Sequence, residues 1–422
     1  MCVIGLTLIG KVGIAGRVEI RQNADASHTL LRDGVPYLAK GAGGSSALRE
    51  LAAAGANSVR TWGVETLATT VDGKPFLDRC HELGLSVTAG IWIKHERHGF
   101  DYKAPAQIEA QRKHVRDAVR KYKDHPAILV WGLGNEMEGP TSDGSEAAVW
   151  KELNELAAII KAEDPDHPVM TVIAGAHPNK IRMVREHYPN IDILGVNAYA
   201  GAGGVGKALL GNGWTKPFML TEFGPVGHWE VGKTAWGAPV EPSSREKAAS
   251  YYAAYQTLMD DASATCVGTH AFLWGNKQET TSTWYGMMLP TGEKLPCVDA
   301  MTRVWTGSWP ANRSPKVIGV TTPLNQAVVK PGTRTTASAE VIDPEGDPLT
   351  YEWLVVSESQ DTKEGGDAES VPPTHPECIP GAPGPAVEIR VPQKPGAYRL
   401  FLFVRDGKGG ASAENFPFRV AN

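Results

Sequence analysis

Eight short apolar runs, each followed by an amphipathic helical pattern, occupy most of residues 36–306. The runs lie at 36–42, 57–62, 86–93, 127–134, 168–174, 191–200, 217–223 and 265–274. Apolar runs of this length, bounded by turn residues, are typical of strands buried on both faces of a parallel sheet. The helical patterns between and after them lie at 45–54, 74–83, 106–123, 146–162, 180–186, near 207, 244–261 and 298–306. Eight such units in roughly 280 residues predict a closed (β/α)8 TIM barrel of the α/β class, with a doubly wound open sheet as the alternative.

The pattern changes after a segment rich in proline and polar residues at 309–315. Short alternating strands are predicted at 316–321, 335–341, 349–356, 386–391, 398–404 and 416–421, separated by turn residues. This spacing is typical of an immunoglobulin-like β-sandwich. We therefore expect a catalytic barrel domain over residues 1–309 and a C-terminal sandwich domain over residues 316–422. The segment 360–384, rich in glycine, proline and acids, is predicted to be a long loop of the sandwich.

Bulk properties exclude several classes of function. The formal net charge of -5 provides no basic surface for nucleic acid, and no apolar run approaches the length of a membrane span. The five cysteines are scattered without the spacing of a zinc site or a small disulfide framework, so buried thiols are expected. The apolar residues 3–10 favour an opening strand over a signal peptide. An extracellular or periplasmic location is favoured, and the redox compartment stays open.

Two glutamates stand where buried strands end. The run 127–134 leads into Asn135 and Glu136, and the run 217–221 leads into Glu222. In a parallel barrel the strand ends form the catalytic face, where ionisable groups are expected for function rather than for packing. Two carboxylates facing each other there could act as acid/base and nucleophile on a glycosidic bond. Glu138 is the alternative to Glu136, although it lies beyond the predicted strand.

The two motifs, Asn135–Glu136 and the run Thr221 to Gly224, resemble those of the retaining glycoside hydrolases of clan A. The segments 122–128 and 33–41 resemble the TIM-barrel domain of glycoside hydrolase family 2, whose amino-terminal sandwich domains this sequence does not contain. The resemblance covers about residues 28–306. It implies that Glu136 is the acid/base and Glu222 the nucleophile, with neither a metal nor an organic cofactor required.

The same resemblance implies roles for four other residues. Arg60 would bond the nucleophile and keep it ionised, and Tyr199 would contact the same carboxylate. Asn135 would bond the sugar 2-hydroxyl, and Trp274 would form the platform under the sugar at the cleaved bond, since indole offers a large apolar face. A buried ion pair for Arg60 and core packing for Tyr199 and Trp274 are the structural alternatives.

Further polar and aromatic residues follow the predicted strand ends and are expected to bind substrate. They are Trp62, Trp92, His95, His98, His177, Asn197, His228 and Trp229. His95 and His98 could also form a metal pair, but no further ligand set accompanies them, so sugar hydrogen bonding is favoured. The glycine-rich segment 201–208 nearly matches a P-loop. Ala208 replaces the hydroxyl residue of that motif, which favours a flexible loop over the active-site face.

The predicted function is a retaining β-glycoside hydrolase that cleaves a β-linked oligo- or polysaccharide by double displacement. A β-glucan, with a β-1,3 linkage as first choice, is the expected substrate, and β-mannan and β-galactoside are alternatives. A transglycosylase would use the same carboxylates, and a non-catalytic carbohydrate-binding protein would use only the cleft. The sandwich could contact polysaccharide or serve adhesion by itself.

Overall fold

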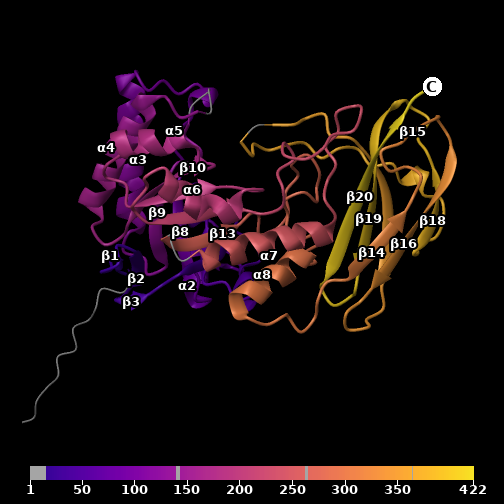
Figure 1. Cartoon of the computed structure of the whole chain (residues 1–422), viewed down its shortest axis with the longest axis horizontal. Coiled ribbons are helices and arrows are strands. Elements are labelled where there is room, and N and C mark those ends of the chain that lie inside the picture. The colour runs from indigo at the N-terminus through magenta and orange to yellow at the C-terminus, as the bar shows by residue number, and fades with distance from the viewer. Residues whose placement is uncertain (1–15, 139–142, 262–264, 364) are drawn as a thin grey trace, which may run out of the picture.

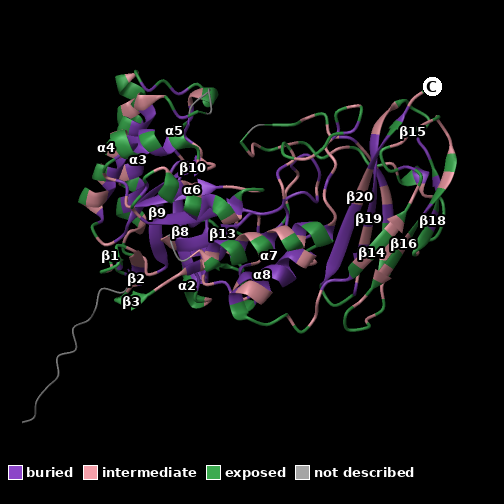
Figure 2. Cartoon of the chain, viewed as in Figure 1, coloured by how far each residue is buried: buried purple, intermediate pink, exposed green. Residues whose placement is uncertain are grey.

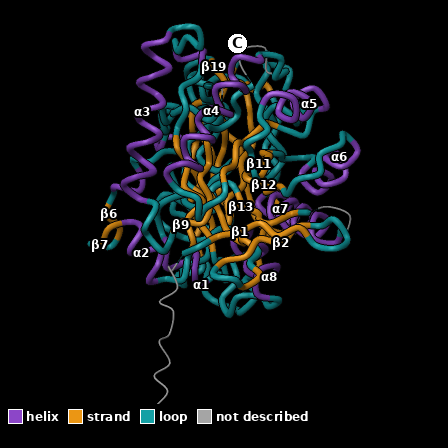
Figure 3. The backbone as a smooth tube through the Cα atoms, turned by 90° about the vertical axis from the view of Figure 1, so that its left-hand side faces the viewer, coloured by secondary structure: helices purple, strands orange, loops and turns teal. Residues whose placement is uncertain are grey.

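The computed structural model describes residues 16–138, 143–261, 265–363 and 365–422. Its centre is a closed barrel of eight parallel strands (Figures 1 and 3). In barrel order they are β4 (Ala39–Gly43), β5 (Ser58–Arg60), β8 (Ser86–Ile91), β9 (Ile128–Leu133), β10 (Val169–Ala174), β11 (Ile193–Asn197), β12 (Phe218–Phe223) and β13 (Cys266–Ala271). The last strand pairs with the first, with Gly268 opposite Ala39. The predicted barrel is confirmed, and the open sheet is wrong.

Eight helices accompany the strands at the positions predicted from the sequence. They are α1 (Leu48–Ala53), α2 (Phe76–Glu82), α3 (Pro105–Tyr122), α4 (Ala147–Glu163), α5 (Pro178–His187), α6 (Val205–Gly211), α7 (Ser244–Asp260) and α8 (Pro296–Thr306). Local sequence explains several of their starts. Proline occupies the first turn of α3, α5 and α8, where no backbone donor is needed. Ser243 and Glu246 form a reciprocal capping box at the start of α7.

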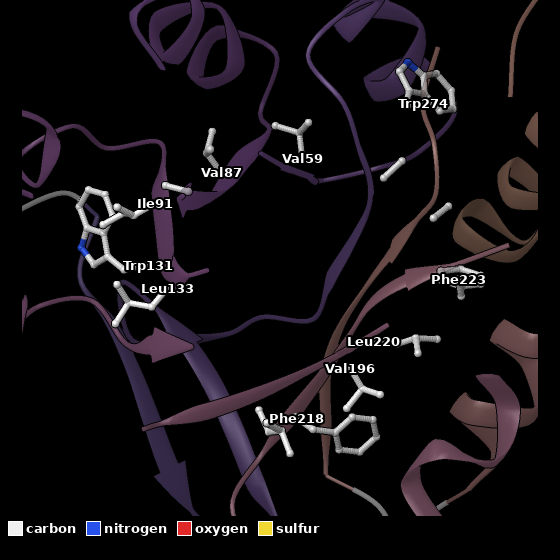
Figure 4. Packing of buried hydrophobic residues seen from close by; sticks show 14 of the residues in the cluster. Val59, Val87, Ile91, Trp131, Leu133, Val196, Phe218, Leu220, Phe223 and Trp274 are labelled. Atoms are coloured by element: carbon white, nitrogen blue, oxygen red, sulfur yellow. The ribbon is translucent and has the colours of Figure 1, made fainter. Parts of the chain in front are cut away.

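The main core lies between the barrel wall and the surrounding helices. Val59, Val87 and Trp131 point outward from three barrel strands and are fully buried (Figure 4). Because both faces of a parallel barrel are covered, its strands are apolar along their whole length, as Figure 2 shows by the buried colour of the strands. The uninterrupted burial of β8, β9 and β12 explains why these strands were readable from the sequence.

A small antiparallel sheet covers the amino-terminal end of the barrel. It consists of β1 (Val18–Gln22), β2 (His28–Arg32) and β3 (Val35–Pro36), and Figure 3 shows β1 and β2 crossing before the barrel. The Val18 amide donates to the Asp166 carbonyl (2.8 Å), and Arg32 donates to the Pro126 carbonyl (2.7 Å). The sheet therefore lies at the end of the barrel opposite the carboxyl ends of its strands. The sequence did not reveal it, and the strand predicted at 3–10 lies outside the described residues.

Residues 316–422, called here the C-terminal unit, contain two sheets that share one apolar cluster. One sheet has β14 (Lys316–Thr321), β16 (Arg334–Ile342) and β18 (Ala386–Arg390), and the other has β15 (Val328–Val329), β20 (Ala411–Val420), β19 (Gly396–Arg405) and β17 (Thr350–Ser357). Trp353, Leu400 and Phe418 lie in the cluster. The six predicted strands are present, although β20 begins before the predicted 416. The sequence missed β15 and the outlying pair β6 (Thr70–Val71) and β7 (Lys74–Pro75).

The C-terminal unit is fixed to the barrel through β19 and β20. The Ala413 amide donates to the Ser244 hydroxyl at the start of α7 (3.1 Å). Arg399 is 2% exposed and donates from one nitrogen to the Pro239 carbonyl of the barrel loop (2.6 Å). The same guanidinium is paired with Glu358 at 2.8 Å and donates to the Asn415 side chain (2.8 Å). A buried cation that joins both parts of the chain holds their relative position.

Replacing Arg399 by Met is expected to lower the free energy of unfolding by about 3–5 kcal/mol, because it leaves the buried Glu358 carboxylate without its partner. Urea denaturation followed by tryptophan fluorescence measures this change. The double variant Arg399→Met with Glu358→Leu should recover part of the loss, since the unpaired charge is gone. Arg419→Met, on the exposed side of β20, is the control and should shift stability by less than about 0.5 kcal/mol. A urea midpoint of Arg399→Met equal to that of the wild type would contradict the stabilising role of the Arg399–Glu358 ion pair.

Candidate active site

A cavity of about 1060 Å³ opens at the carboxyl ends of the barrel strands. Glu136, which follows β9, and Glu222, near the end of β12, both line it. The remaining lining comes from the loops after several other barrel strands and from the C-terminal unit. The structure thus brings the two predicted carboxylates to one concave site, the face of a barrel where catalytic residues are expected.

The Glu222 carboxyl accepts hydrogen bonds from three donors. Its Oε1 accepts from the Arg60 guanidinium at 2.8 Å and from the Trp62 indole at 2.9 Å. Its Oε2 accepts from the Tyr199 hydroxyl at 3.0 Å. Burial raises the pKa of Tyr199 well above its usual value, so the phenol stays protonated and donates. Three donors, one of them cationic, stabilise the ionised form of a buried carboxyl.

Arg60 joins the two catalytic strands. One nitrogen bonds both the Thr221 carbonyl and Glu222 on β12, and the other donates to the Asn135 side-chain oxygen at 2.7 Å. The guanidinium could form two hydrogen bonds to one carboxylate. It does not do so here, because its two terminal nitrogens bond different residues. Below it lies His270, buried completely, whose pKa is lowered to about 3 by burial and by the Arg60 charge. The neutral imidazole adds no second positive charge beneath the site.

Glu136 follows a backbone turn that aims it into the cavity. It adopts a positive φ of 53°, next to Gly134 at 69°, and its amide donates to the Val172 carbonyl at 3.0 Å. Positive φ is uncommon for residues with a side chain, and such strain gathers at functional sites. Asn197 donates to the Glu136 Oε1 at 2.7 Å and to the Asn135 side-chain oxygen at 3.1 Å. The Asn135 oxygen is thereby occupied, which leaves its amide nitrogen for a ligand.

The two carboxyls have different environments. Burial, followed by the negative charges of Glu222 and Glu138, raises the pKa of Glu136 to about 7. Burial also raises the pKa of Glu138, but its carboxylate lies against Lys180 at 3.3 Å and accepts from the Ala174 amide. Glu138 therefore belongs to an ion pair behind β10 and does not line the cavity. A carboxyl of raised pKa beside a carboxylate that accepts several hydrogen bonds is the arrangement that separates acid from nucleophile.

Seven of the predicted binding residues lie in the cavity wall: Trp62, Trp92, Asn135, Asn197, Tyr199, His228 and Trp229. Trp229 is 56% exposed, so its ring is open to a ligand. The flexible loop predicted over the active-site face is instead the short helix η3 (Ala202–Gly204) followed by α6, and it does line the cavity.

The structure places Trp274 outside the cavity, so the predicted sugar platform is wrong. Its ring is buried, and its indole nitrogen donates to the Ala47 carbonyl at 3.0 Å. The reason is a turn after β13 that ends the alternation at Ala271. Phe272 takes the lining position and packs edge-on against Trp62 and Tyr199, with ring centroids at 5.9 and 6.1 Å.

Three predicted histidines also lie away from the cavity lining. His95 is buried behind Trp92, with ring centroids 5.2 Å apart, and its Nδ1 faces the Arg97 guanidinium at 3.1 Å. His98 pairs with Asp367 of the C-terminal unit at 3.2 Å. His177 accepts from the Asn179 amide and caps α5. Their positions after strand ends were correct, but each ring is used by protein contacts instead.

Several lining residues escaped the sequence analysis. Glu230, Lys277 and Glu279 follow the carboxyl ends of β12 and β13, a position that could have marked them. Lys363, Gly365, Gly366 and Asp367 come from the C-terminal unit. No pattern in the sequence predicts that these residues contact the barrel. The only unusual feature is that their loop is rich in glycine, proline and acids. Among the described residues, no group of histidine, cysteine and acidic side chains could hold a metal ion, and no helix is long and apolar enough to cross a membrane.

Replacing Glu222 by Gln is expected to lower the pKa of Glu136 from about 7, because the negative charge that disfavours its ionisation is removed while Arg60 remains. Carbon-13 NMR titration of glutamate side-chain carboxyls measures it, with Glu136→Gln to assign the signal. Glu138→Gln should lower the same pKa by less, since its charge is the smaller contribution. An unchanged Glu136 titration in Glu222→Gln would show that the carboxylates are not coupled.

Comparison with known proteins gives the barrel a family resemblance. Residues 70–235, which include both carboxylates, match the model of the glycosyl hydrolases family 2, TIM barrel domain. A protein of Formosa agariphila is 29% identical over 168 residues, which are 39% of this chain and 14% of that protein. The β-glucuronidase of Sus scrofa is 29% identical over 94 residues, 22% of this chain and 13% of that enzyme. The chain therefore matches only a small part of these longer proteins.

Solved structures agree on the fold. β-Glucuronidase 2 of Bacteroides uniformis superposes with a TM-score of 0.51 at 14% identity, covering 96% of this chain and 48% of that one. The family 2 β-galacturonidase of Eisenbergiella tayi gives 0.52 at 17% identity, covering 70% and 55%. The resemblance predicted from the strand-end motifs is confirmed: the barrel of this chain resembles the TIM-barrel domain of glycosyl hydrolases family 2.

Proposed function

We propose that this protein is a retaining β-glycoside hydrolase in which Glu222 is the nucleophile and Glu136 the acid/base. The observation that carries the proposal is that two carboxyls in one cavity differ in their hydrogen-bond donors and in the influences on their pKa. Glu222 accepts from three donors, one of them a guanidinium, whereas burial raises the pKa of Glu136 to about 7 and keeps much of it protonated near neutral pH. Both lining groups belong to the stretch that matches the family 2 barrel.

The chemistry follows from these environments. The Glu222 carboxylate attacks the anomeric carbon while the Glu136 proton moves to the leaving glycosidic oxygen, so the C–O bond breaks as the glycosyl-enzyme ester forms. Glu136, now ionised, takes a proton from water, whose oxygen attacks the same carbon and releases Glu222. Two inversions give net retention. The Tyr199 and Trp62 donors orient the nucleophile, and the Asn135 amide nitrogen has the position to bond the sugar 2-hydroxyl.

The charge of the cavity favours a neutral sugar over a uronic acid. Its lining carries five carboxyl side chains: Glu136, Glu222, Glu230, Glu279 and Asp367. The lining also carries two ammonium groups, and each is already paired, Lys277 with Glu279 at 2.6 Å and Lys363 with Asp361. A substrate carboxylate would add a like charge to this site. The charge therefore supports a neutral sugar as the substrate we propose. Within that class we keep β-linked glucose polymers, with the β-1,3 linkage first, from the resemblance to glucan-acting families of the clan.

We also propose that residues 1–309 form the catalytic domain and that residues 316–422 form an immunoglobulin-like accessory sandwich. The two sheets around one apolar cluster support this assignment. Contact of this unit with the carbohydrate is part of the proposal, and its loop residues in the cavity lining support that contact.

Glu222→Gln is expected to abolish turnover, because an amide cannot displace the leaving group. Glu136→Gln should lower kcat by about 10²–10⁴ on substrates with poor leaving groups, which need the proton. Rates on aryl β-glycosides and proton NMR of the first-formed sugar measure both effects. The wild-type product should retain the β configuration, and an inverted product would sink the mechanism. Glu138→Gln, whose carboxyl faces Lys180, is the control and should keep most of the kcat.

A substrate panel tests the sugar separately from the mechanism. The panel contains aryl β-glucoside, β-galactoside, β-mannoside, β-glucuronide and β-galacturonide, together with β-1,3- and β-1,4-glucans. We expect the best neutral glycoside to exceed both uronides in kcat/KM by at least about tenfold, a difference of about 1.4 kcal/mol. A uronide as the best substrate would contradict the charge argument while leaving the two carboxylate roles intact.

A further inference from the structure

One wall of the cavity comes from the loop between β17 and β18. We call residues 361–363 and 365–369 the wall segment, of which Lys363, Gly365, Gly366 and Asp367 line the same cavity as the two carboxylates. Figure 1 shows this orange loop extending from the C-terminal sheets toward the barrel. A segment more than 130 residues beyond Glu222 in the sequence thus faces the reacting groups.

The wall segment is fixed to the barrel at two separate loops. After β13, the Lys277 ammonium donates to the Gly366 carbonyl at 2.8 Å, and the Thr280 amide donates to the Glu369 carboxylate at 2.6 Å. After β8, the His98 ring lies 3.2 Å from the Asp367 carboxylate. Because β4 and β5 lie between β13 and β8 in the barrel, the segment spans the mouth above those two strands.

The barrel's own loops contribute little to the cavity lining at this point. After β4, only residues 44–47 precede α1, and none of them lines the cavity. After β5, Trp62 is the one residue of 61–65 among the lining residues that the structure describes. The wall segment therefore supplies the cavity lining on the side of β4 and β5, where the barrel's own loops supply little.

The backbone of the wall segment lies very close to side chains of the barrel loops. Gly365 and Gly366 have positive φ values of 62° and 74°. A Cβ at Gly365 would lie 2.7 Å from an Arg97 nitrogen, and one at Gly366 would lie 2.9 Å from the Lys277 nitrogen. Glu369 braces the segment internally, because its second oxygen accepts from the Lys363 amide at 3.1 Å. Glycine is favoured here by the backbone conformation, while the close nitrogens are the ends of flexible side chains that touch the segment.

The wall segment lies on the nucleophile's side of the cavity. Lys277, which donates to Gly366, lies over the Phe272 ring at 5.3 Å, and Phe272 packs against Trp62 and Tyr199. Both of these residues donate to Glu222. The charges that act on Glu136 come from Glu222, Glu138 and Arg60. Since Glu136 must protonate the leaving oxygen, the leaving group lies toward Glu136. The wall segment then faces the sugar that is transferred to Glu222.

We propose that the wall segment is part of the binding site for the transferred sugar, so that the C-terminal unit determines sugar specificity. The Asp367 carboxylate and the Gly365–Gly366 backbone bond hydroxyl groups of that sugar, and Glu369 acts as a positioning residue that holds the segment against Thr280. This inference rests on the proposed glycosidase function and adds to it the element that selects the sugar.

Steady-state kinetics of Asp367→Ala and Glu369→Ala on 4-nitrophenyl β-glycosides test the proposal. Both variants should raise KM for the best glycoside at least about tenfold while kcat changes less, because ground-state contacts to the sugar are lost. The rise should depend on the sugar and be the same for 4-nitrophenyl and methylumbelliferyl leaving groups. Glu369→Gln, which keeps one acceptor, should recover part of the KM. Glu377→Ala, an exposed carboxyl later in the same loop, is the matched control and should match the wild type.

A 2-deoxy-2-fluoro glycosyl fluoride separates this inference from the underlying function. It should leave a glycosyl group on Glu222 of the wild type, detected by mass spectrometry of the intact chain. Absence of this adduct would overturn the glycosidase mechanism, and the inference with it. Adduct formation together with wild-type KM values for every sugar in Asp367→Ala and Glu369→Ala would overturn the wall segment alone. A change that follows the leaving group rather than the sugar would overturn it too, and unchanged urea midpoints confirm that the variants fold.

Discussion

The active site depends on how one guanidinium is shared. Arg60 leaves β5 inside the barrel and bonds Glu222 on β12 and Asn135 beside Glu136. A single buried cation thereby sets the distance between groups that belong to strands far apart in the sequence. Its positive charge lies 2.8 Å from the Glu222 carboxyl, as an ion pair within the barrel. His270 is neutral because burial and the Arg60 charge lower its pKa to about 3, so Arg60 has no second positive charge beside it.

The same arrangement explains why the two glutamates differ although both are buried. Glu222 receives three donors, whereas the carboxyl of Glu136 receives one neutral donor, Asn197. The negative charge stabilised at Glu222 then acts on Glu136 and opposes its ionisation. Burial makes the largest contribution to the raised pKa of Glu136 and the Glu222 charge adds to it, so the two carboxyls differ through both burial and an asymmetric set of hydrogen bonds.

The sequence predicted those parts of the site that strand periodicity determines. Glu136 and Glu222 follow apolar runs whose burial is uninterrupted, so their arrival at the strand ends could be read directly. Trp274 was misplaced because a turn after Ala271 breaks the alternation, and no residue pattern announced that turn. His95 and His177 were found after strand ends, yet local contacts within their own loops decide where the rings lie. The β1–β2 sheet was missed because its strands are short and carry many polar residues.

The wall segment was beyond prediction for a different reason. Its four lining residues are brought to the cavity by the placement of a whole unit, which β20, Arg399 and the start of α7 determine together. The residues near position 366 in the sequence do not determine that placement. Among the described residues, the loop after β4 contributes nothing to the cavity lining and the loop after β5 contributes only Trp62. The long loop after β17 supplies the lining on that side. The barrel carries the chemistry, while a segment far along the chain completes the concave site, and for this reason the buried contacts between the two parts matter for the site as well as for stability.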